Sequence, residues 1–204
     1  MTAAPPGGWD ARYAGADYLF GTEPARFLVE QSGHLAGARR VLVVADGEGR
    51  NSVWLAEQGL DVTAFDASSV AVGKARALAA RRGVSADLRV ADIDAWEWGG
   101  GYDAVVAVFI QFATPVQRAT IFEGMKRALR PGGLLLLHGY RPEQLGYGTG
   151  GPPDAGNMYT KEMLREAFGD MTMLRLVAYD RDIREGRGHA GMSALIDLVA
   201  RKPA

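Results

Sequence analysis

Short apolar runs alternate with amphipathic stretches along most of the chain. Runs of four to eight apolar residues predict buried strands, and they cover 41–45, 62–65, 88–91, 102–109 and 134–137. The stretches between them predict helices over 51–58, 68–82 and 114–129. Such regular alternation of strand and helix predicts a parallel sheet with helices on both faces.

Polar residues, prolines and glycines mark where these helices begin and end. Ser68 is placed to cap the helix that Gly83 closes, and Thr114 with Pro115 opens the next one. Near the N-terminus, Thr22 is placed to cap a helix with Glu23 and Pro24 in its first turn, ending near Gly33.

The C-terminal third departs from simple alternation. A helix over 160–168 precedes two long strand-like segments, 172–182 and 188–201, joined by five residues. A parallel pair would need a crossover of a dozen or more residues. The two strands are therefore predicted to be antiparallel, which makes the sheet mixed at one edge.

No linker or repeat divides the sequence, so we predict a single domain over 1–204. The stretch 141–157 is rich in glycine and proline and follows a central strand. Long irregular loops in compact domains are often functional. We therefore treat 141–159 as a candidate lid.

Composition narrows the range of functions. The 204 residues carry a formal net charge of -1 with a sequence pI near 6.3, so nothing predicts binding to nucleic acid or to an anionic membrane. The chain has no cysteine, which excludes disulfides and thiolate chemistry. His34, His138 and His189 show no metal-binding spacing, so no metal site is predicted. Without a signal-peptide pattern or a membrane-length apolar run, a cytoplasmic location is the default expectation.

The first strand runs into a turn that contains Gly47 and Gly49. In open α/β sheets, ligands bind beyond the carboxyl ends of the strands, where a glycine turn lets them approach the backbone. The dinucleotide fingerprint needs a third glycine where this chain has Ser52, which disfavours a nicotinamide cofactor. The turn could also be only a tight connection.

Two acids end the next two strands. Asp66 is placed to accept hydrogen bonds from both hydroxyls of a ribose, as an adenosine cofactor would require. Asp92 could accept from an adenine amino group, with Ile93 as an apolar neighbour of the ring. Either acid could instead cap a helix or face water.

Several blocks together resemble the class I methyltransferases, and within them the small bacterial branch similar to tellurite-resistance-type enzymes. The resemblance covers nearly the whole chain. The blocks are Trp9-Asp10-Ala11-Arg12-Tyr13, Tyr18-Leu19-Phe20-Gly21-Thr22-Glu23-Pro24, Asp46-Gly47-Glu48-Gly49-Arg50-Asn51, Asp66 and Leu129-Arg130-Pro131-Gly132-Gly133. The resemblance implies a three-layer Rossmann-like sandwich with a seven-stranded, mostly parallel sheet and an antiparallel C-terminal strand.

The resemblance also implies S-adenosylmethionine as cofactor, lying across Gly47 and Gly49, with the segment 1–33 closing over it. Phe109 would lie near the sulfonium, and Arg12 could pair with the methionine carboxylate. The implied cofactor-binding residues are Trp9, Arg12, Tyr18, Ala45, Asp46, Gly47, Gly49, Asn51, Asp66, Ala67, Asp92, Ile93 and Phe109.

The chain departs from the family pattern at two positions. The family often has an acid at the position of Val43 and a glycine at that of Ala45. Because the acid usually helps to hold the methionine ammonium, Asp46 or a backbone carbonyl would have to substitute. A non-catalytic binding module that kept the fold is therefore one alternative function.

Candidates for catalysis gather after the fifth strand and at the final hairpin. Methyl transfer needs positioning and exclusion of water, and it needs a base only if the acceptor arrives protonated. The candidates are His138, Tyr140, Arg187 and His189. Either histidine could instead be structural, and Arg187 could simply be solvated.

The leading hypothesis is a methyltransferase for a small nucleophilic acceptor such as an oxyanion, a thiol or a small metabolite. A nicotinamide-dependent oxidoreductase is the alternative from another reaction class. The sequence predicts a small-molecule substrate, and it predicts neither the identity of the acceptor nor the oligomeric state.

Overall fold

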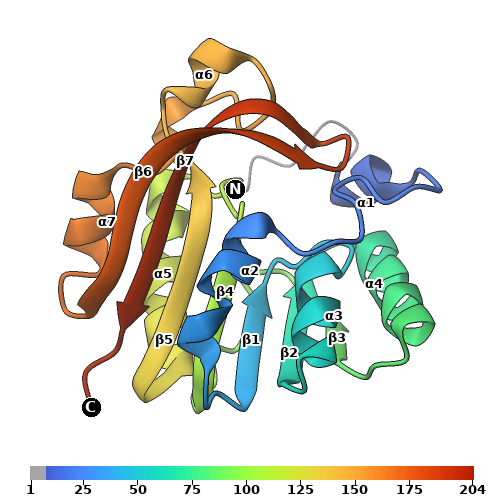
Figure 1. Cartoon of the computed structure of the whole chain (residues 1–204), viewed down its shortest axis with the longest axis horizontal. Helices are drawn as coiled ribbons and strands as arrows, with labels where there is room; N and C mark the ends of the chain where they lie inside the picture. Colours follow the sequence, from blue (N-terminus) through green and yellow to red (C-terminus); the bar gives the residue numbers. More distant parts are fainter. Residues whose placement is uncertain (1–7) are drawn as a thin grey trace.

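Residues 8–204 are described by a computed structural model, in which a central sheet of seven strands has the order β3-β2-β1-β4-β5-β7-β6 (Figure 1). The strands are β1 (Arg40–Val44), β2 (Asp61–Asp66), β3 (Asp87–Val90), β4 (Tyr102–Val108), β5 (Leu129–Tyr140), β6 (Thr172–Glu185) and β7 (His189–Arg201). β1 pairs in parallel with β2 and β4, β2 pairs in parallel with β3, and β4 pairs in parallel with β5. β7 is antiparallel to both of its neighbours. The predicted fold class and the antiparallel C-terminal strand are confirmed.

Helices cover both faces of this sheet, as the alternating pattern predicts. They are α1 (Gly8–Tyr13), α2 (Arg26–Gln31), α3 (Arg50–Glu57), α4 (Ser69–Arg82), α5 (Pro115–Ala128), α6 (Gln144–Tyr147) and α7 (Lys161–Ala167), with short 3-10 turns η1 (Ser32–Leu35) and η2 (Ala155–Asn157). One core lies beneath α2, α3 and α4, and a second lies beneath α5 and α7. Burial of apolar side chains on both faces stabilises the three layers.

Side-chain caps fix the starts of three of the helices. The side chains of Ser68, Thr114 and Thr160 each accept a backbone N–H in the first turn of α4, α5 and α7. Gly83 closes α4 with a left-handed φ of 68°. The predicted caps at Ser68 and Thr114 and the predicted stop at Gly83 are confirmed.

The prediction of a helix capped by Thr22 is wrong. α2 begins only at Arg26, and Ala25 at its start provides no side-chain cap. The backbone N–H of Ala25 instead donates to Asn51 Oδ1 at 2.9 Å. A tertiary contact therefore holds the backbone at Ala25 outside the helix, and residues 22–25 remain non-helical. α2 also ends early, at Gln31, and continues as the 3-10 turn η1.

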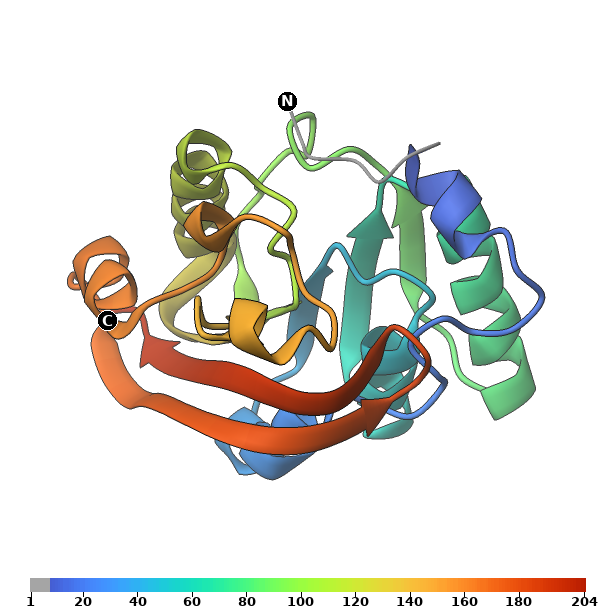
Figure 2. The same ribbon diagram turned by 90° about the horizontal axis from the view of Figure 1, so that it is seen from above.

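The hairpin of β6 and β7 is long and arches over the carboxyl end of the sheet toward α1 (Figures 1 and 2). Its tip meets the N-terminal segment, where Gly188 N donates to Leu19 O at 3.0 Å. A Cβ on Gly188 would lie 2.3 Å from the ring of Phe20. Only glycine allows this approach, which brings the two ends of the chain together above the site.

The candidate lid, residues 141–159, is partly anchored. Gln144 is fully buried and its side-chain oxygen accepts from Ala194 N at 2.9 Å. Met158 and Tyr159, at the end of the segment, are buried as well. The segment is therefore attached to β7 and to the core, while residues 145–148 between these anchors are exposed.

Two features are absent from residues 8–204. No helix within this range has the length and apolar character needed to cross a membrane. The same residues contain no group of three or more histidine, aspartate or glutamate side chains placed to hold a metal ion.

Candidate functional site

The turn between β1 and α3 has the backbone conformation that glycine favours. Gly47 and Gly49 have φ angles of 65° and 90°. A Cβ on Gly49 would lie 2.6 Å from the Cβ of Ala75, so the turn can pack against α4 only with glycine there. The start of α3 is thereby held at the carboxyl edge of the sheet, where ligands bind in such folds.

Ala45 occupies a left-handed conformation without being glycine. Its φ is 48°, which costs an L-residue about 1 kcal/mol. Glycine would adopt the same conformation without this cost. Val43 is 1% exposed and belongs to the core beneath α3. The departures at Val43 and Ala45 therefore leave the turn geometry intact.

Asp66, at the end of β2, lies directly beside the turn. Its two carboxylate oxygens accept from Gly47 N and Ser68 N, each at 2.9 Å. Burial of the carboxyl group raises its pKa, and the two N–H donors oppose this shift. Each oxygen keeps lone-pair capacity after accepting one bond. Asp66 can therefore accept further hydrogen bonds from a bound hydroxyl pair.

Asp46 turns back onto the first turn of α3. Its carboxylate accepts from the hydroxyl of Ser52 and from Ser52 N, the latter at 3.3 Å. Burial raises the pKa of Asp46 to about 6, against the effect of these donors. Asp46 thus acts as a helix cap whose charge is sensitive to pH.

Tyr13, in α1, lies over the glycine turn. A Cβ built on Gly47 would lie 3.1 Å from the Tyr13 hydroxyl, and the ring is 5% exposed. Burial, together with the charges of Asp66 and Glu48, raises the pKa of Tyr13. Asp10 anchors α1, because it accepts from Ser68 Oγ at 2.6 Å at the start of α4.

Aromatic rings of the N-terminal segment pack at the carboxyl edge of the sheet, and residues 1–7 of the segment predicted to cover the cofactor lie outside the described residues. The ring of Trp9 lies 6.3 Å from that of Tyr13 and meets Phe112 edge-on at 5.6 Å. Phe112 follows β4, so these contacts join the two sides of the carboxyl edge. The rings close the edge of the sheet from above.

Side chains of the turn itself hold this cover in place. Glu48 is 3% exposed and accepts from Leu19 N at 2.6 Å and from Lys74 Nζ at 2.7 Å. Arg50 pairs with Glu185 of the hairpin at 2.7 Å. Arg50 therefore connects the glycine turn to the β6–β7 hairpin. Asn51 connects the turn to the backbone just before α2.

Three of the expected cofactor residues lie around the ends of β2 and β3. Asp92 and Ala67 are exposed, whereas Ile93 is 6% exposed and packs in the core. One oxygen of Asp92 accepts from Asp94 N at 2.9 Å. Tyr18 lies elsewhere, since its hydroxyl donates to Lys74 O at 2.9 Å on α4.

Four of the predicted residues form a cluster of rings at the ends of β4, β5 and β7. The ring of Phe109 lies 4.7 Å from those of His138 and Tyr140 and 4.1 Å from that of His189. Phe109 has a left-handed φ of 56°. Such strain at a non-glycine residue is typical of functional sites. Phe20 covers the cluster, with its ring 4.3 Å from His189.

Two polar atoms of this cluster are buried without a partner. His189 Nδ1 and the Tyr140 hydroxyl have no hydrogen-bond partner among residues 8–204. His189 is 8% exposed and Tyr140 is 2% exposed. Burial is the main cause of the lowered pKa of His189, and the charges of Arg50, His138 and Arg12 add to it. His189 is therefore neutral near pH 7.

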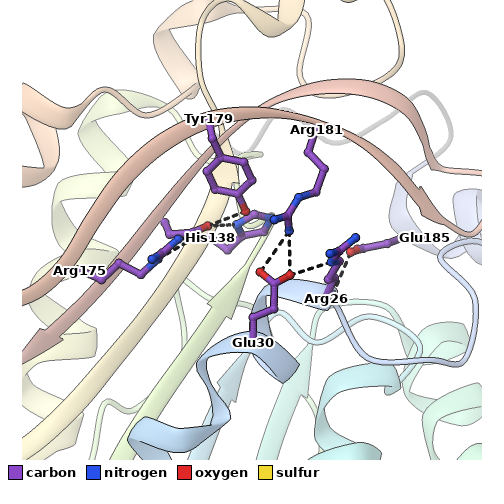
Figure 3. A network of polar contacts seen from close by, with 8 residues as sticks. Arg26, Glu30, His138, Arg175, Tyr179, Arg181 and Glu185 are labelled. Carbon is purple, nitrogen blue, oxygen red and sulfur yellow. Dashed lines mark hydrogen bonds and ion pairs between the residues drawn. The ribbon is translucent and has the colours of Figure 1, made fainter.

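A polar network around the buried Asp197 fixes the His138 ring in place (Figure 3). Its Nδ1 lies 2.8 Å from Asp197 Oδ1, and Asp197 also accepts from Arg175 and from the Tyr179 hydroxyl. The His138 ring also stacks on the ring of Phe27, with 4.8 Å between the ring centroids. His138 is thus fixed in orientation, whereas His189 has a free nitrogen.

Two predicted arginines stay at the surface. Arg187, at the hairpin tip, is 69% exposed and lies 3.5 Å from Asp17. Arg12 is exposed, with its guanidinium 5.9 Å from the centre of the Phe20 ring. Neither lies within the ring cluster. Sequence reasoning did not single out Asp197 as a site residue, because no local motif marks it.

Residues 41–133 match the family described as "Methyltransferase domain". An uncharacterized methyltransferase from Synechocystis is 31% identical over 108 residues, covering 50% of this chain and 48% of that protein. A glycine/sarcosine N-methyltransferase from Halorhodospira halochloris is 34% identical over 109 residues, covering 50% and 40%. The chain thus spans half or less of the length of these curated relatives.

Solved structures match over much more of the chain. The structure described as "Conversion of a Disulfide Bond into a Thioacetal Group during Echinomycin Biosynthesis" has a TM-score of 0.79 at 20% identity, covering 96% of this chain and 90% of that one. TehB from Haemophilus influenzae has a TM-score of 0.70 at 20% identity, covering 85% and 61%. NodS, an N-methyltransferase from Bradyrhizobium japonicum solved with S-adenosyl-l-homocysteine, has a TM-score of 0.71 at 17% identity, covering 96% and 97%.

The fold, with its glycine turn and Asp66, is therefore that of the class I S-adenosylmethionine-dependent methyltransferases. Residues 41–133, just under half of the chain, are similar to a methyltransferase domain. The predicted resemblance is confirmed, including the likeness to TehB. The residues present also fit the cofactor of this class, because Asp66 retains free acceptor capacity beside the glycine turn.

Proposed function

We propose that the chain is an S-adenosylmethionine-dependent methyltransferase that acts on a small nucleophilic acceptor. One observation carries the proposal: the bare backbone of Gly47 lies beside the Asp66 carboxylate and beneath the Tyr13 hydroxyl. A backbone surface, an acceptor pair for ribose hydroxyls and a ring cover are what an adenosine cofactor requires.

Residues of the carboxyl edge would divide the work of binding. Gly47 and Gly49 would support the cofactor, with Asp66 on the ribose and Ile93 and Ala67 near the adenine. Asp92 could accept from the adenine amino group through its remaining lone pairs. Asp46 would face the methionine end, and Tyr13 would lie above it.

The ring cover and the cluster would serve the transfer itself. When bound, S-adenosylmethionine supplies an electrophilic methyl group on a sulfonium. Trp9, Tyr13, Phe20 and Phe112 would exclude water from this region, and Phe109 would form the wall toward the acceptor. Excluding water and fixing orientation are the main contributions a protein makes to such a displacement.

The competing hypotheses receive less support. At the position of the third dinucleotide glycine, Ser52 uses its hydroxyl to bond Asp46, so the turn is built differently from a nicotinamide site. A binding module without activity would also keep Asp66 and the turn. The ring cluster with its unpaired polar atoms favours an enzyme over this second alternative.

Two measurements on the purified protein test the proposal. S-adenosylhomocysteine at 100 times its Kd should raise the free energy of unfolding by about 2.7 kcal/mol. Radiolabelled methyl groups from S-adenosylmethionine should pass to at least one member of a panel of small thiols, phenols, amines and oxyanions. Stabilisation without any transfer would identify a binding module, and the absence of both would reject the proposal.

A further inference from the structure

The ring cluster has the chemistry of a binding site for one small polar group on an apolar body. Its walls are the rings of Phe20, Phe109, Tyr140 and His189. The only buried side-chain atoms in it without a partner, among residues 8–204, are His189 Nδ1 and the Tyr140 hydroxyl. Native proteins rarely leave buried polar atoms unpaired, and such atoms often mark a place where a ligand binds.

The charges around the cluster favour a developing anion over a cation. Arg50 and Arg12 are near enough to His189 to lower its pKa. The carboxylate near Tyr140 is Glu185, which is already paired with Arg50 at 2.7 Å. An ammonium group in the cluster would therefore face the positive charges of Arg50 and Arg12, with no free carboxylate to pair with it.

A neutral histidine argues against an acceptor that is already an oxyanion. Such an acceptor has no proton to lose, and it would need several donors, as phosphate and similar anions do. The nearby Arg50 is committed to Glu185, and the Tyr140 hydroxyl offers one donor. The site is matched to a neutral acceptor that gives up one proton.

Phe20 separates the cluster from open space. One side of its ring packs on His189, and the residue also lines a cavity of about 450 Å³ between residues 20–26 and 182–186. The cavity is large enough for a small organic molecule. Phe20 therefore borders both this cavity and the His189 ring.

On the basis of the methyltransferase function proposed above, we propose that the acceptor is a small phenol or thiol whose O–H or S–H group binds between His189 Nδ1 and the Tyr140 hydroxyl. It enters from the cavity behind Phe20, and its apolar body packs on Phe109. Phenols and thiols share the feature the site selects, a weakly acidic hydrogen on a neutral, apolar molecule.

The proposed step balances without a further reactant. The O–H or S–H proton of the acceptor passes to His189 Nδ1. The freed electron pair on oxygen or sulfur forms the bond to the methyl carbon, and the electrons of the broken carbon–sulfur bond remain on the sulfur of the cofactor product. The products are the methylated acceptor, S-adenosylhomocysteine and a protonated His189, which releases its proton to solvent.

Nuclear magnetic resonance of ¹⁵N-histidine-labelled protein tests this directly, because the chain has only three histidines. The protein, with and without S-adenosylhomocysteine, is titrated with p-cresol, propanethiol, sarcosine and selenite. We expect p-cresol or propanethiol to shift the His189 Nδ1 signal saturably and to leave His34 unchanged. Sarcosine and selenite should not shift it.

Matched variants sharpen the test. Tyr140→Phe should weaken binding of the active probe about fivefold, the worth of one hydrogen bond, whereas Tyr147→Phe at the exposed end of α6 should have no effect. His189→Gln should slow methyl transfer about a hundredfold and flatten its dependence on pH, while binding of S-adenosylhomocysteine stays the same. His34→Gln is the control.

The outcomes separate this proposal from the proposed function. If S-adenosylhomocysteine binds but sarcosine or selenite alone moves His189, or no probe does, the acceptor class is wrong. If p-cresol or propanethiol moves His189 although S-adenosylhomocysteine does not bind, the acceptor site stands and the methyltransferase function fails.

Discussion

His138 Nδ1 lies 2.8 Å from Asp197 Oδ1, and this contact joins β5 to β7 inside the core. Asp197 is fully buried and also accepts from Arg175 and Tyr179 of β6 (Figure 3). One carboxylate therefore links the three strands that form the mixed edge of the sheet. It also fixes the His138 ring against Phe109, at the border of the ring cluster.

Asp197→Asn should lower the free energy of unfolding by about 2 kcal/mol, because a buried amide cannot accept from His138, Arg175 and Tyr179 as the carboxylate does. Urea unfolding measures this change. Asp180→Asn is the matched control on the next strand, since Asp180 pairs with Arg141 but is 48% exposed, and its loss should cost under about 1 kcal/mol. A loss of under about 1 kcal/mol in Asp197→Asn as well would contradict a stabilising role of the network.

Gly49→Ala should destabilise the protein by about 2 kcal/mol or more. The added Cβ would lie 2.6 Å from Ala75 Cβ, and the residue would have to keep a φ of 90°. Gly73→Ala is the control, because Gly73 lies within α4 and a Cβ there would meet nothing within 4 Å. That variant should be up to about 1 kcal/mol more stable than the parent. Thermal unfolding of the two proteins should therefore shift in opposite directions.

Asp66→Asn should weaken S-adenosylhomocysteine binding about tenfold, because an amide offers one acceptor oxygen where the carboxylate offers two. Calorimetric titration gives the Kd. Asp87→Asn, at the exposed start of β3, serves as the control for a changed net charge. An unchanged Kd in a folded Asp66→Asn protein would remove this residue from the cofactor site.

The raised pKa of Asp46 has a consequence for stability. Its pKa rises from 3.8 to about 6 on folding, so the native state binds the proton more tightly than the unfolded chain does. The free energy of unfolding should therefore fall as pH increases through this window. The Asp46→Asn protein should not lose stability in this way. Its free energy of unfolding, relative to that of the parent, should therefore increase as the pH rises from 4 to 6. Urea unfolding at a series of pH values measures this change. The Asp61→Asn protein, changed at an exposed position, should show the same pH dependence of stability as the parent. An Asp46→Asn curve parallel to that of the parent would contradict the assignment.

Local signals in the sequence predicted much of the fold. Ser68 and Thr114 cap the helices they precede, and the short connection at 183–187 predicted the antiparallel hairpin. Thr22 misled because the path of residues 22–25 is set by Asn51, 26 residues from Ala25 in the sequence. A capping pattern reports only local preference, which a tertiary contact overrides.

The site was only partly predictable for the same reason. Gly47, Gly49 and Asp66 lie in recognisable motifs at strand ends, and they meet as expected. The role of Asp197 depends on partners 18 to 59 residues away in the sequence, on neighbouring strands. Nor could the sequence show that Phe20 would cover His189, since their contact depends on the hairpin tip meeting the N-terminal segment.

Isothermal titration with S-adenosylhomocysteine and, separately, with NADH tests the central claim most directly, because both ligands carry an adenosine that Asp66 could hold. The account predicts saturable, micromolar binding of S-adenosylhomocysteine and none of NADH. Binding of NADH alone, or of neither ligand, would contradict it.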